Sequence, residues 1–188
     1  MVGPFSTARL LLRPFTLADL DDVWAYQRRP EVARFMSWSA RDREQSRRSL
    51  EQIIREDGLR VEGDCLALAV VLRDTGRVVG HVELVWRSRA HRRGELGYVL
   101  DPRHQGHGYA TEAATEMLRY GFEEFGLHRI VARCNTRNTA SARLMERLGM
   151  RREAHFRECA FGKGEWRDEY VYALLRTEWT RTPHQRGG

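Results

Sequence analysis

Residues 95–122 join an apolar strand to a helix through a loop that contains two glycines, and this unit constrains the fold most. Its first six residues are mostly apolar and lead into a turn. Beyond Gly106 and Gly108, apolar or small residues recur at helical spacing. The unpaired N–H groups and the positive dipole end of such a helix start suit a phosphate or pyrophosphate. We therefore expect an anion-binding loop in a fold that mixes strands and helices.

Two common phosphate-binding loops do not fit this segment. A Walker loop needs a Lys after its last glycine, and none follows here. The dinucleotide fingerprint needs Gly or Ala at its sixth position, where this chain has Thr111. Read from Gln105, the pattern is instead Gln-x-x-Gly-x-Ala, ending at Ala110.

This pattern resembles the acyl-CoA pyrophosphate loop of the GCN5-related N-acetyltransferases (the GNAT superfamily). Further motifs of that family follow in order: Gly97-Tyr98-Val99-Leu100-Asp101-Pro102 with Gly108-Tyr109-Ala110-Thr111-Glu112-Ala113, Asn135-x-x-Asn138-x-x-Ser141 with Glu146-Arg147-Leu148-Gly149-Met150, and Gly164-x-Trp166-x-Asp168. Together with the tail through Glu178-Trp179, they are similar to the branch of ribosomal-protein-alanine and -serine N-acetyltransferases (RimJ/RimL-like). The resemblance spans roughly residues 8–180.

The resemblance implies acetyl-CoA as co-substrate and a set of residues that contact it. This set is Val99, Leu100, Gln105, Gly106, His107, Gly108, Tyr109, Ala110, Asn135 and Asn138. The family splays two parallel strands, here 96–100 and 130–135, so that the pantetheine arm pairs like an extra strand. Backbone N–H groups near Val99 and Leu100 would then face the acetyl oxygen. Alternatives stay open, because Asn138 could simply cap a helix and Asn135 could satisfy the strand's backbone.

The expected general acid is where this chain departs from the family. Many members carry a tyrosine four positions before the glycine that ends the helix, and here that position is Met145. Ser141, one helical turn earlier on the same face, is our candidate for stabilising or protonating the leaving thiolate. A serine that only satisfies the helix start is the alternative.

Two glutamates are candidates for the general base. An α-amine, with a pKa of about 7.7–8.0, needs only modest help to lose its proton. Glu83 and Glu95 could act directly or through water, and of the two we favour Glu95 slightly. For each, orienting the substrate or serving the structure is the alternative that we favour over acting as the sole base. Asp168 resembles a family acid near the acceptor groove, with a salt bridge as its alternative.

Other site types are not expected. His104 and His107 lack the carboxylate pattern of a metalloprotease helix, so we predict no metal site. Cys134 is interpreted as a buried strand cysteine rather than a covalent nucleophile. Five residues near the first helices could line an acceptor pocket or belong to the core, which we favour slightly: Trp24, Tyr26, Phe35, Met36 and Trp38.

Composition is consistent with one globular domain of 188 residues, 41% hydrophobic and 31% charged. No apolar run is long enough to span a membrane, the N-terminus lacks a signal pattern, and three cysteines form no CxxC, so we expect a cytoplasmic protein. The net charge of +6 comes almost entirely from arginine. This charge indicates either a solvated basic surface or anionic partners. Because no aromatic residues lie between the arginines of its basic clusters, direct nucleic-acid binding is not expected.

Periodicity and turn signals predict the order β-α-α-β-β-β-α-β-α-β-β. The expected strands are 9–13, 65–72, 78–86, 95–100, 129–135, 151–160 and 170–175, and the expected helices are 16–27, 42–56, 110–124 and 139–148. We expect an α/β (α+β) fold: a single GNAT-like domain over 8–180 with a mixed, mostly antiparallel sheet, splayed central parallel strands and helices on both faces. Residues 181–188 are expected to be a disordered tail.

Our leading hypothesis is an acetyl-CoA-dependent N-acetyltransferase that acetylates a primary amine by direct attack in a ternary complex. The acceptor, a protein N-terminus or a small-molecule amine, stays open, and so does a homodimer. The alternative is a catalytically weak CoA-binding regulatory or interaction module, which Met145 makes conceivable. A third hypothesis, RNA binding through the basic surface, predicts steeply salt-dependent affinity.

Overall fold

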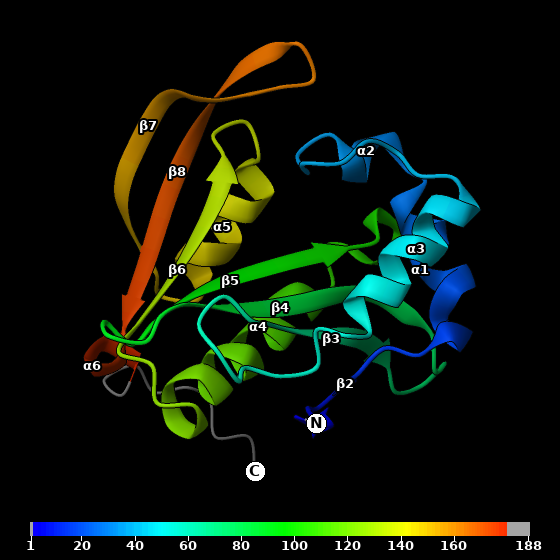
Figure 1. The fold of residues 1–188 in the computed structure, drawn as a ribbon, viewed down its shortest axis with the longest axis horizontal. Helices are drawn as coiled ribbons and strands as arrows, with labels where there is room; N and C mark the ends of the chain where they lie inside the picture. Colours follow the sequence, from blue (N-terminus) through cyan, green and yellow to red (C-terminus); the bar gives the residue numbers. More distant parts are fainter. Residues whose placement is uncertain (1, 180–188) are drawn as a thin grey trace.

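The computed structural model describes residues 2–179, whose strands form one eight-stranded sheet (Figure 1). The strands are β1 (Phe5–Ser6), β2 (Leu10–Arg13), β3 (Cys65–Leu72), β4 (Val78–Ser88), β5 (Arg93–Leu100), β6 (Arg129–Asn135), β7 (Arg151–Gly162) and β8 (Glu165–Leu175). Their order in the sheet is β1-β2-β3-β4-β5-β6-β8-β7. Among the described strands only β5 and β6 pair in parallel, which confirms a mixed, mostly antiparallel sheet.

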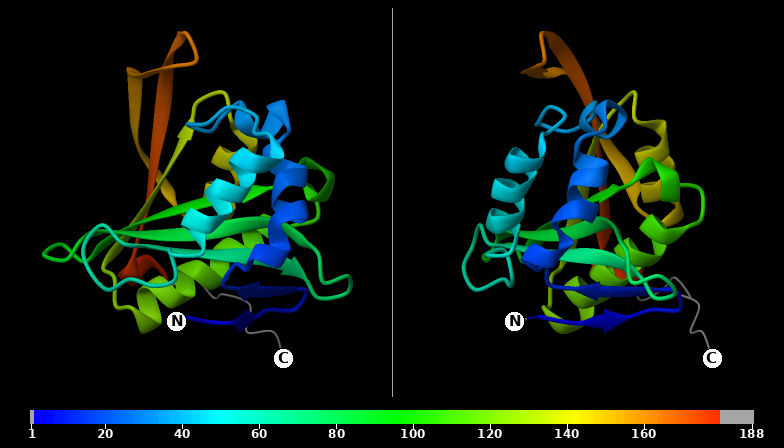
Figure 2. Two further views of the ribbon diagram at one scale, coloured as in Figure 1. Left: turned by 45° about the vertical axis from the view of Figure 1, so that its right-hand side comes forward. Right: turned by 90° about the vertical axis from the view of Figure 1, so that its right-hand side faces the viewer.

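Helices cover both faces of this sheet (Figure 2). They are α1 (Leu20–Gln27), α2 (Pro30–Ala33), α3 (Arg43–Ile53), α4 (Tyr109–Arg119), α5 (Thr139–Arg147) and α6 (Arg176–Trp179). Each face has its own buried core. One contains Val23, Tyr26 and Leu50 from α1 and α3. The other contains Met117 and Leu144 from α4 and α5, as the helical spacing predicts.

Local sequence signals explain most of these boundaries. Thr16 and Asp19 form the predicted capping box, in which the Thr16 N–H donates to the Asp19 carboxylate over 2.8 Å. Asp42 and Gln45 form a second box at the start of α3. The predicted helix to about 124 is α4 followed by a π-helical turn, Tyr120–Glu124.

Some elements were not predicted. β1, α2 and α6 are too short for periodicity to show, at two to four residues each. β7 and β8 are longer than expected because they continue as a hairpin joined by a turn at Lys163, which has a φ of 55°. The expected tail at 181–188 lies outside the described residues.

The parallel pair opens where the site is built. β5 and β6 pair only at Arg93↔Arg129, Gly94↔Ile130 and Glu95↔Val131. Beyond these residues the two strands diverge, β5 staying with β4 and β6 with β8 (Figure 1). The predicted splay of the central strands is therefore present, and it leaves strand edges without a sheet partner at the point of divergence.

Candidate active site

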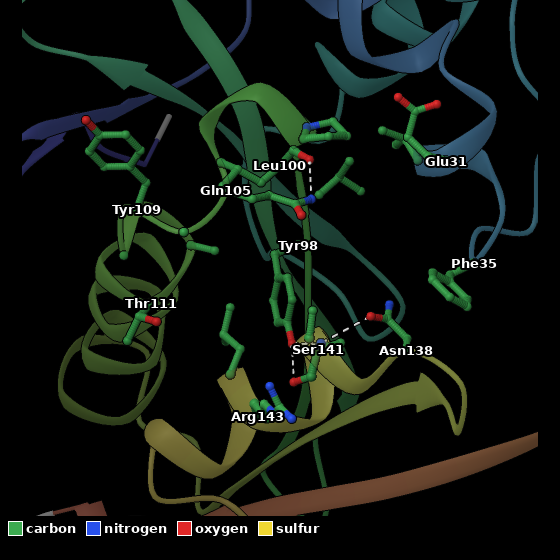
Figure 3. A pocket seen from close by; sticks show the side chains of 18 of the residues that line it. Glu31, Phe35, Tyr98, Leu100, Gln105, Tyr109, Thr111, Asn138, Ser141 and Arg143 are labelled. Atoms are coloured by element: carbon green, nitrogen blue, oxygen red, sulfur yellow. Dashed lines mark hydrogen bonds between the residues drawn. The ribbon is translucent and has the colours of Figure 1, made fainter.

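A cavity of about 650 Å³ lies beside the C-terminal half of β5. The glycine loop and the first turn of α4 form one wall, and α5 forms another. Residues near α2, Glu31 and Phe35 among them, face it from the other side (Figure 3). Two cations from α5, Arg143 and Arg147, also line it. The cavity thus combines a helix start with positive side chains, which suits a large anionic ligand.

The loop geometry depends on its two glycines. Gly106 and Gly108 have φ of 81° and 83°, a left-handed conformation that costs other residues free energy. Gly108 is also the residue from which α4 begins. Arg9 supports the loop from outside: its Nη1 donates to the His107 carbonyl over 2.8 Å, and its guanidinium lies 4.7 Å from the Tyr109 ring centroid.

At the inner end of this cavity, β5 meets the start of α5. Asn138 caps α5, its Oδ1 accepting from the Ser141 N–H over 3.1 Å. The Tyr98 hydroxyl reaches from β5 to the Ser141 Oγ, 2.7 Å away (Figure 3). Burial raises the pKa of Tyr98 to about 12, so the phenol stays protonated at neutral pH.

A second cavity of about 400 Å³ lies on the other side of this point. It shares six lining residues with the first: Phe35, Met36, Tyr98, Val99, Asn138 and Ser141. Its remaining wall includes Glu83 from β4, Glu95 from β5 and Arg133 from β6. One cavity with a helix start and one lined with carboxylates therefore meet at Tyr98 and Ser141.

The two carboxylates of the smaller cavity differ in their surroundings. Glu95 is paired with Arg87 at 2.9 Å and lies 4.0 Å from Arg133. Glu83 has no such ion pair among the described residues, and burial, followed by the charge of Glu95, raises its pKa. Gly97 lies opposite Glu83 in the sheet, and a Cβ there would come within 2.5 Å of the Glu83 Oε1. The glycine leaves room for this carboxylate.

Comparison with known proteins decides the family. Residues 9–151 match the model of the family described as "Acetyltransferase (GNAT) domain". The chain belongs to the GNAT acetyltransferase family. It is 36% identical to the "uncharacterized N-acetyltransferase YnaD" of Bacillus subtilis (strain 168), over 93% of this chain and 98% of the relative.

Two further matches concern the branch and the fold. The "[ribosomal protein uS5]-alanine N-acetyltransferase" of Escherichia coli (strain K12) is 35% identical over 85 residues, 45% of this chain and 44% of the relative. The structure of a spermidine N-acetyltransferase from Vibrio cholerae, in complex with CoA and spermine, superposes with a TM-score of 0.78. It covers 93% of this chain and 100% of its own, at 22% identity, which is a likeness of fold. Homologues thus include the predicted ribosomal-protein branch, and this GNAT chain is an N-acetyltransferase.

Most residues predicted to contact the cofactor lie together in this GNAT domain. The larger cavity is lined by Val99, Leu100, Gln105, Gly106, Gly108, Tyr109, Ala110 and Asn138, together with Ser141. His107 does not line it; its ring stacks on Tyr109 at 5.7 Å. Asn135 faces the smaller cavity instead, and its Oδ1 accepts from the Arg137 N–H over 2.8 Å. The roles of all these residues stay predictions.

The remaining candidates divide between site and core. Phe35, Met36 and Trp38 line the smaller cavity, whereas Tyr26 belongs to a core. Asp168 lines neither cavity; its carboxylate contacts the His155 Nε2 at 3.0 Å and accepts from the Glu158 N–H.

Met145 and Cys134 differ in whether they reach a cavity. Met145 is fully buried in the core and lines neither cavity. Cys134 is buried and lines the smaller cavity. Burial raises the pKa of its thiol to about 11, and a hydrogen bond with Ser141 partly offsets this. The thiol is therefore protonated at neutral pH, which does not favour a nucleophile.

A group of three possible metal ligands borders the smaller cavity. Ligand atoms of Glu56, Cys65 and Glu83 all lie within 4.8 Å of one another. Burial raises the pKa of each of these groups, which favours their protonated forms. A protonated thiol is not the form that binds a metal ion.

Among residues 2–179, no helix has the length and apolar composition that crossing a membrane requires.

Tyr98 lines both cavities but was not predicted as a site residue from the sequence. It stands within the quoted motif Gly97-Tyr98-Val99, but a tyrosine on a strand has no pattern that separates a pocket residue from a core residue. Its contact with Ser141 joins positions 43 residues apart in the sequence. Only the folded chain brings the two hydroxyls together.

Proposed function

We propose that this GNAT chain transfers the acetyl group of acetyl-CoA to a primary amine by direct attack within a ternary complex. The observation that carries the proposal is that two cavities meet at one point. The larger has a helix-start loop suited to a pyrophosphate, the smaller is lined by Glu83 and Glu95, and both reach Tyr98 and Ser141. A thioester entering from one side and an amine from the other would meet there.

The larger cavity supports acetyl-CoA as the donor. Backbone N–H groups after Gly108 and the positive end of α4 suit the pyrophosphate, and Arg143 and Arg147 add positive charge. A volume of about 650 Å³ is in the range of ligand sites for molecules of substantial size. The Vibrio cholerae structure with CoA has the same fold.

The smaller cavity supports proton removal from the amine. As the amine nitrogen bonds to the acetyl carbon, its proton passes to Glu83, directly or through one water. A raised pKa makes Glu83 a better base than an ordinary carboxylate. The C–S bond then breaks, and the leaving thiolate takes the proton of the Ser141 hydroxyl. The proton held by Glu83 passes through water to the Ser141 oxygen, which restores both residues. An amine that arrives as a cation gives its extra proton to solvent before the neutral nitrogen attacks.

Carboxylates beside a small cavity favour an acceptor that arrives as a cation. Relatives are named for an alanine of a ribosomal protein and for spermidine, and both of these acceptors carry amines. We propose a protein N-terminus or a small-molecule amine as the acceptor.

The test is thiol release from acetyl-CoA in the presence of peptide N-termini, polyamines, amino acids and aminoglycoside-like amines. We expect at least one amine class to give saturable thiol release with an acetylated product detected by mass spectrometry. Saturable CoA binding with no acetylated product from any amine would contradict the proposal.

A further inference from the structure

Two hydroxyl groups face each other where the two cavities meet, and the family's usual tyrosine position does not supply either. That position, Met145, is buried in the core and lines neither cavity. The phenol at this point comes instead from the neighbouring strand. Tyr98 lines both cavities, and so does Ser141 (Figure 3).

The two hydroxyls are close enough for one to donate to the other. The Tyr98 hydroxyl has one proton and two acceptors within reach, the Ser141 Oγ at 2.7 Å and the Ser141 carbonyl at 3.3 Å. The shorter contact is typical of a good O–H···O bond, and the longer one is weak. The 2.7 Å contact is a hydrogen bond whichever hydroxyl donates, so the chemistry of the two groups assigns the donor. The phenol is the more acidic hydroxyl and the aliphatic Oγ the better acceptor, which favours donation by Tyr98 to Oγ.

The serine is fixed from a second direction as well. Asn138 accepts from its backbone N–H over 3.1 Å, which anchors the first turn of α5. When Tyr98 donates to one lone pair of Oγ, the serine proton stays available for a sulfur acceptor, and the Cys134 thiol already forms a hydrogen bond with this hydroxyl. Three other groups affect the pKa of the Tyr98 hydroxyl through their charge. They are Cys134 on β6, Arg147 on α5 and Tyr172 on β8.

We propose that Tyr98 is a positioning residue, which donates to the Ser141 Oγ and so turns the serine's own proton toward the sulfur of the bound thioester. This rests on the proposed function, because it assumes that Ser141 serves the leaving thiolate. As the C–S bond breaks, the thiolate accepts the serine proton, and the Tyr98 hydrogen bond stabilises the charge left on Oγ until the amine proton taken by Glu83 returns to it through water. Tyr98 thus acts through Ser141 and is not itself the acid.

A double-mutant cycle tests this with Tyr98→Phe and Ser141→Ala. Tyr98→Phe keeps the ring and should lower kcat about tenfold, with little change in the KM for acetyl-CoA. Ser141→Ala should lower kcat by roughly 10²-fold. Because Tyr98 acts through Ser141, the double variant should be no slower than Ser141→Ala. Additive losses, or an unchanged kcat for Tyr98→Phe, would overturn the inference.

Tyr120→Phe is the matched control. Tyr120 is a buried tyrosine in the π-helical turn after α4, and it lines neither cavity. It should keep the wild-type kcat.

A second readout separates this inference from the proposed function. The thiolate absorbance of bound CoA is measured as a function of pH. The pH is kept below the pKa of Cys134, about 11, and that of Tyr98, about 12, so that neither protein group ionises. The bound thiol should lose its proton at lower pH in the wild type than in Tyr98→Phe, since the oriented serine stabilises the thiolate. This shift without turnover of any amine would contradict the proposed function alone. Equal titrations, or no CoA binding, would overturn the inference.

Discussion

At the scale of single residues, the proposed base is the buried carboxylate of Glu83. Glu83 has a raised pKa because it is buried and faces Glu95, and Gly97 leaves it space. Glu95 is instead paired with Arg87. This asymmetry makes Glu83 our candidate for the base, whereas the sequence slightly favoured Glu95.

Glu83→Gln should therefore reduce activity and change its pH dependence. In the wild type, kcat/KM should fall as the pH drops through the raised pKa of Glu83. The variant should lose this acidic limb and be slower by roughly 10²-fold near neutral pH. Initial rates across the pH range check this, with Glu51→Gln on α3 as a control outside both cavities. A variant with wild-type rates would exclude Glu83 as the base.

The same substitution should increase stability at higher pH. A carboxyl whose pKa is higher in the folded than in the unfolded state favours folding when protonated. That contribution is lost as the pH rises from the ordinary value of 4.5 through the folded pKa. The glutamine of the variant does not titrate, so the melting temperature of the variant relative to the wild type should rise over this window. A constant difference at every pH would contradict the assigned environment.

At the scale of elements, the glycine loop and α4 form the unit that the sequence predicted best. Alternating signals of strand, turn and helix are local, so residues 95–119 could be assigned without knowledge of the rest of the chain. α2 could not, because a four-residue helix beginning at Pro30 has no periodicity. The start of α5 was predicted, but its role at the cavity depends on Tyr98 from a distant strand.

Gly108→Val tests the loop as a unit. A valine would be strained at a φ of 83°, would come within 3.3 Å of Arg9, and would block the close approach of a pyrophosphate. We expect acetyl-CoA binding to be lost in calorimetry while the fold persists. Gly76→Val is the matched control, since Gly76 also has a positive φ, in the turn between β3 and β4, and lines neither cavity. Equal affinity in both variants would remove the loop from the cofactor site.

At the scale of the whole molecule, the proposed function depends on the splay of β5 from β6. The sequence of each strand predicts a strand, but their divergence after Glu95↔Val131 follows from how β6 pairs with β8 and β5 with β4. We expected the splay from the family resemblance, since no local pattern shows it. The two cavities and their shared wall could be located only in the folded chain.

A cofactor that fills the opened sheet should stabilise the whole domain. At acetyl-CoA concentrations about 100 times the dissociation constant, binding contributes about 2.7 kcal/mol. For a chain of this size, this raises the melting temperature by roughly 5–10 °C. Thermal unfolding with and without acetyl-CoA checks this, and Gly108→Val should show no shift. The absence of a shift in the wild type would contradict binding between the splayed strands.

The proposed reaction is direct transfer between two cavities that meet at Tyr98 and Ser141. Initial rates measured over a matrix of acetyl-CoA and acceptor concentrations distinguish it from transfer through an acetylated enzyme. Direct attack in a ternary complex predicts double-reciprocal lines that intersect. Parallel lines, the pattern of a ping-pong reaction through an acetylated enzyme, would contradict it.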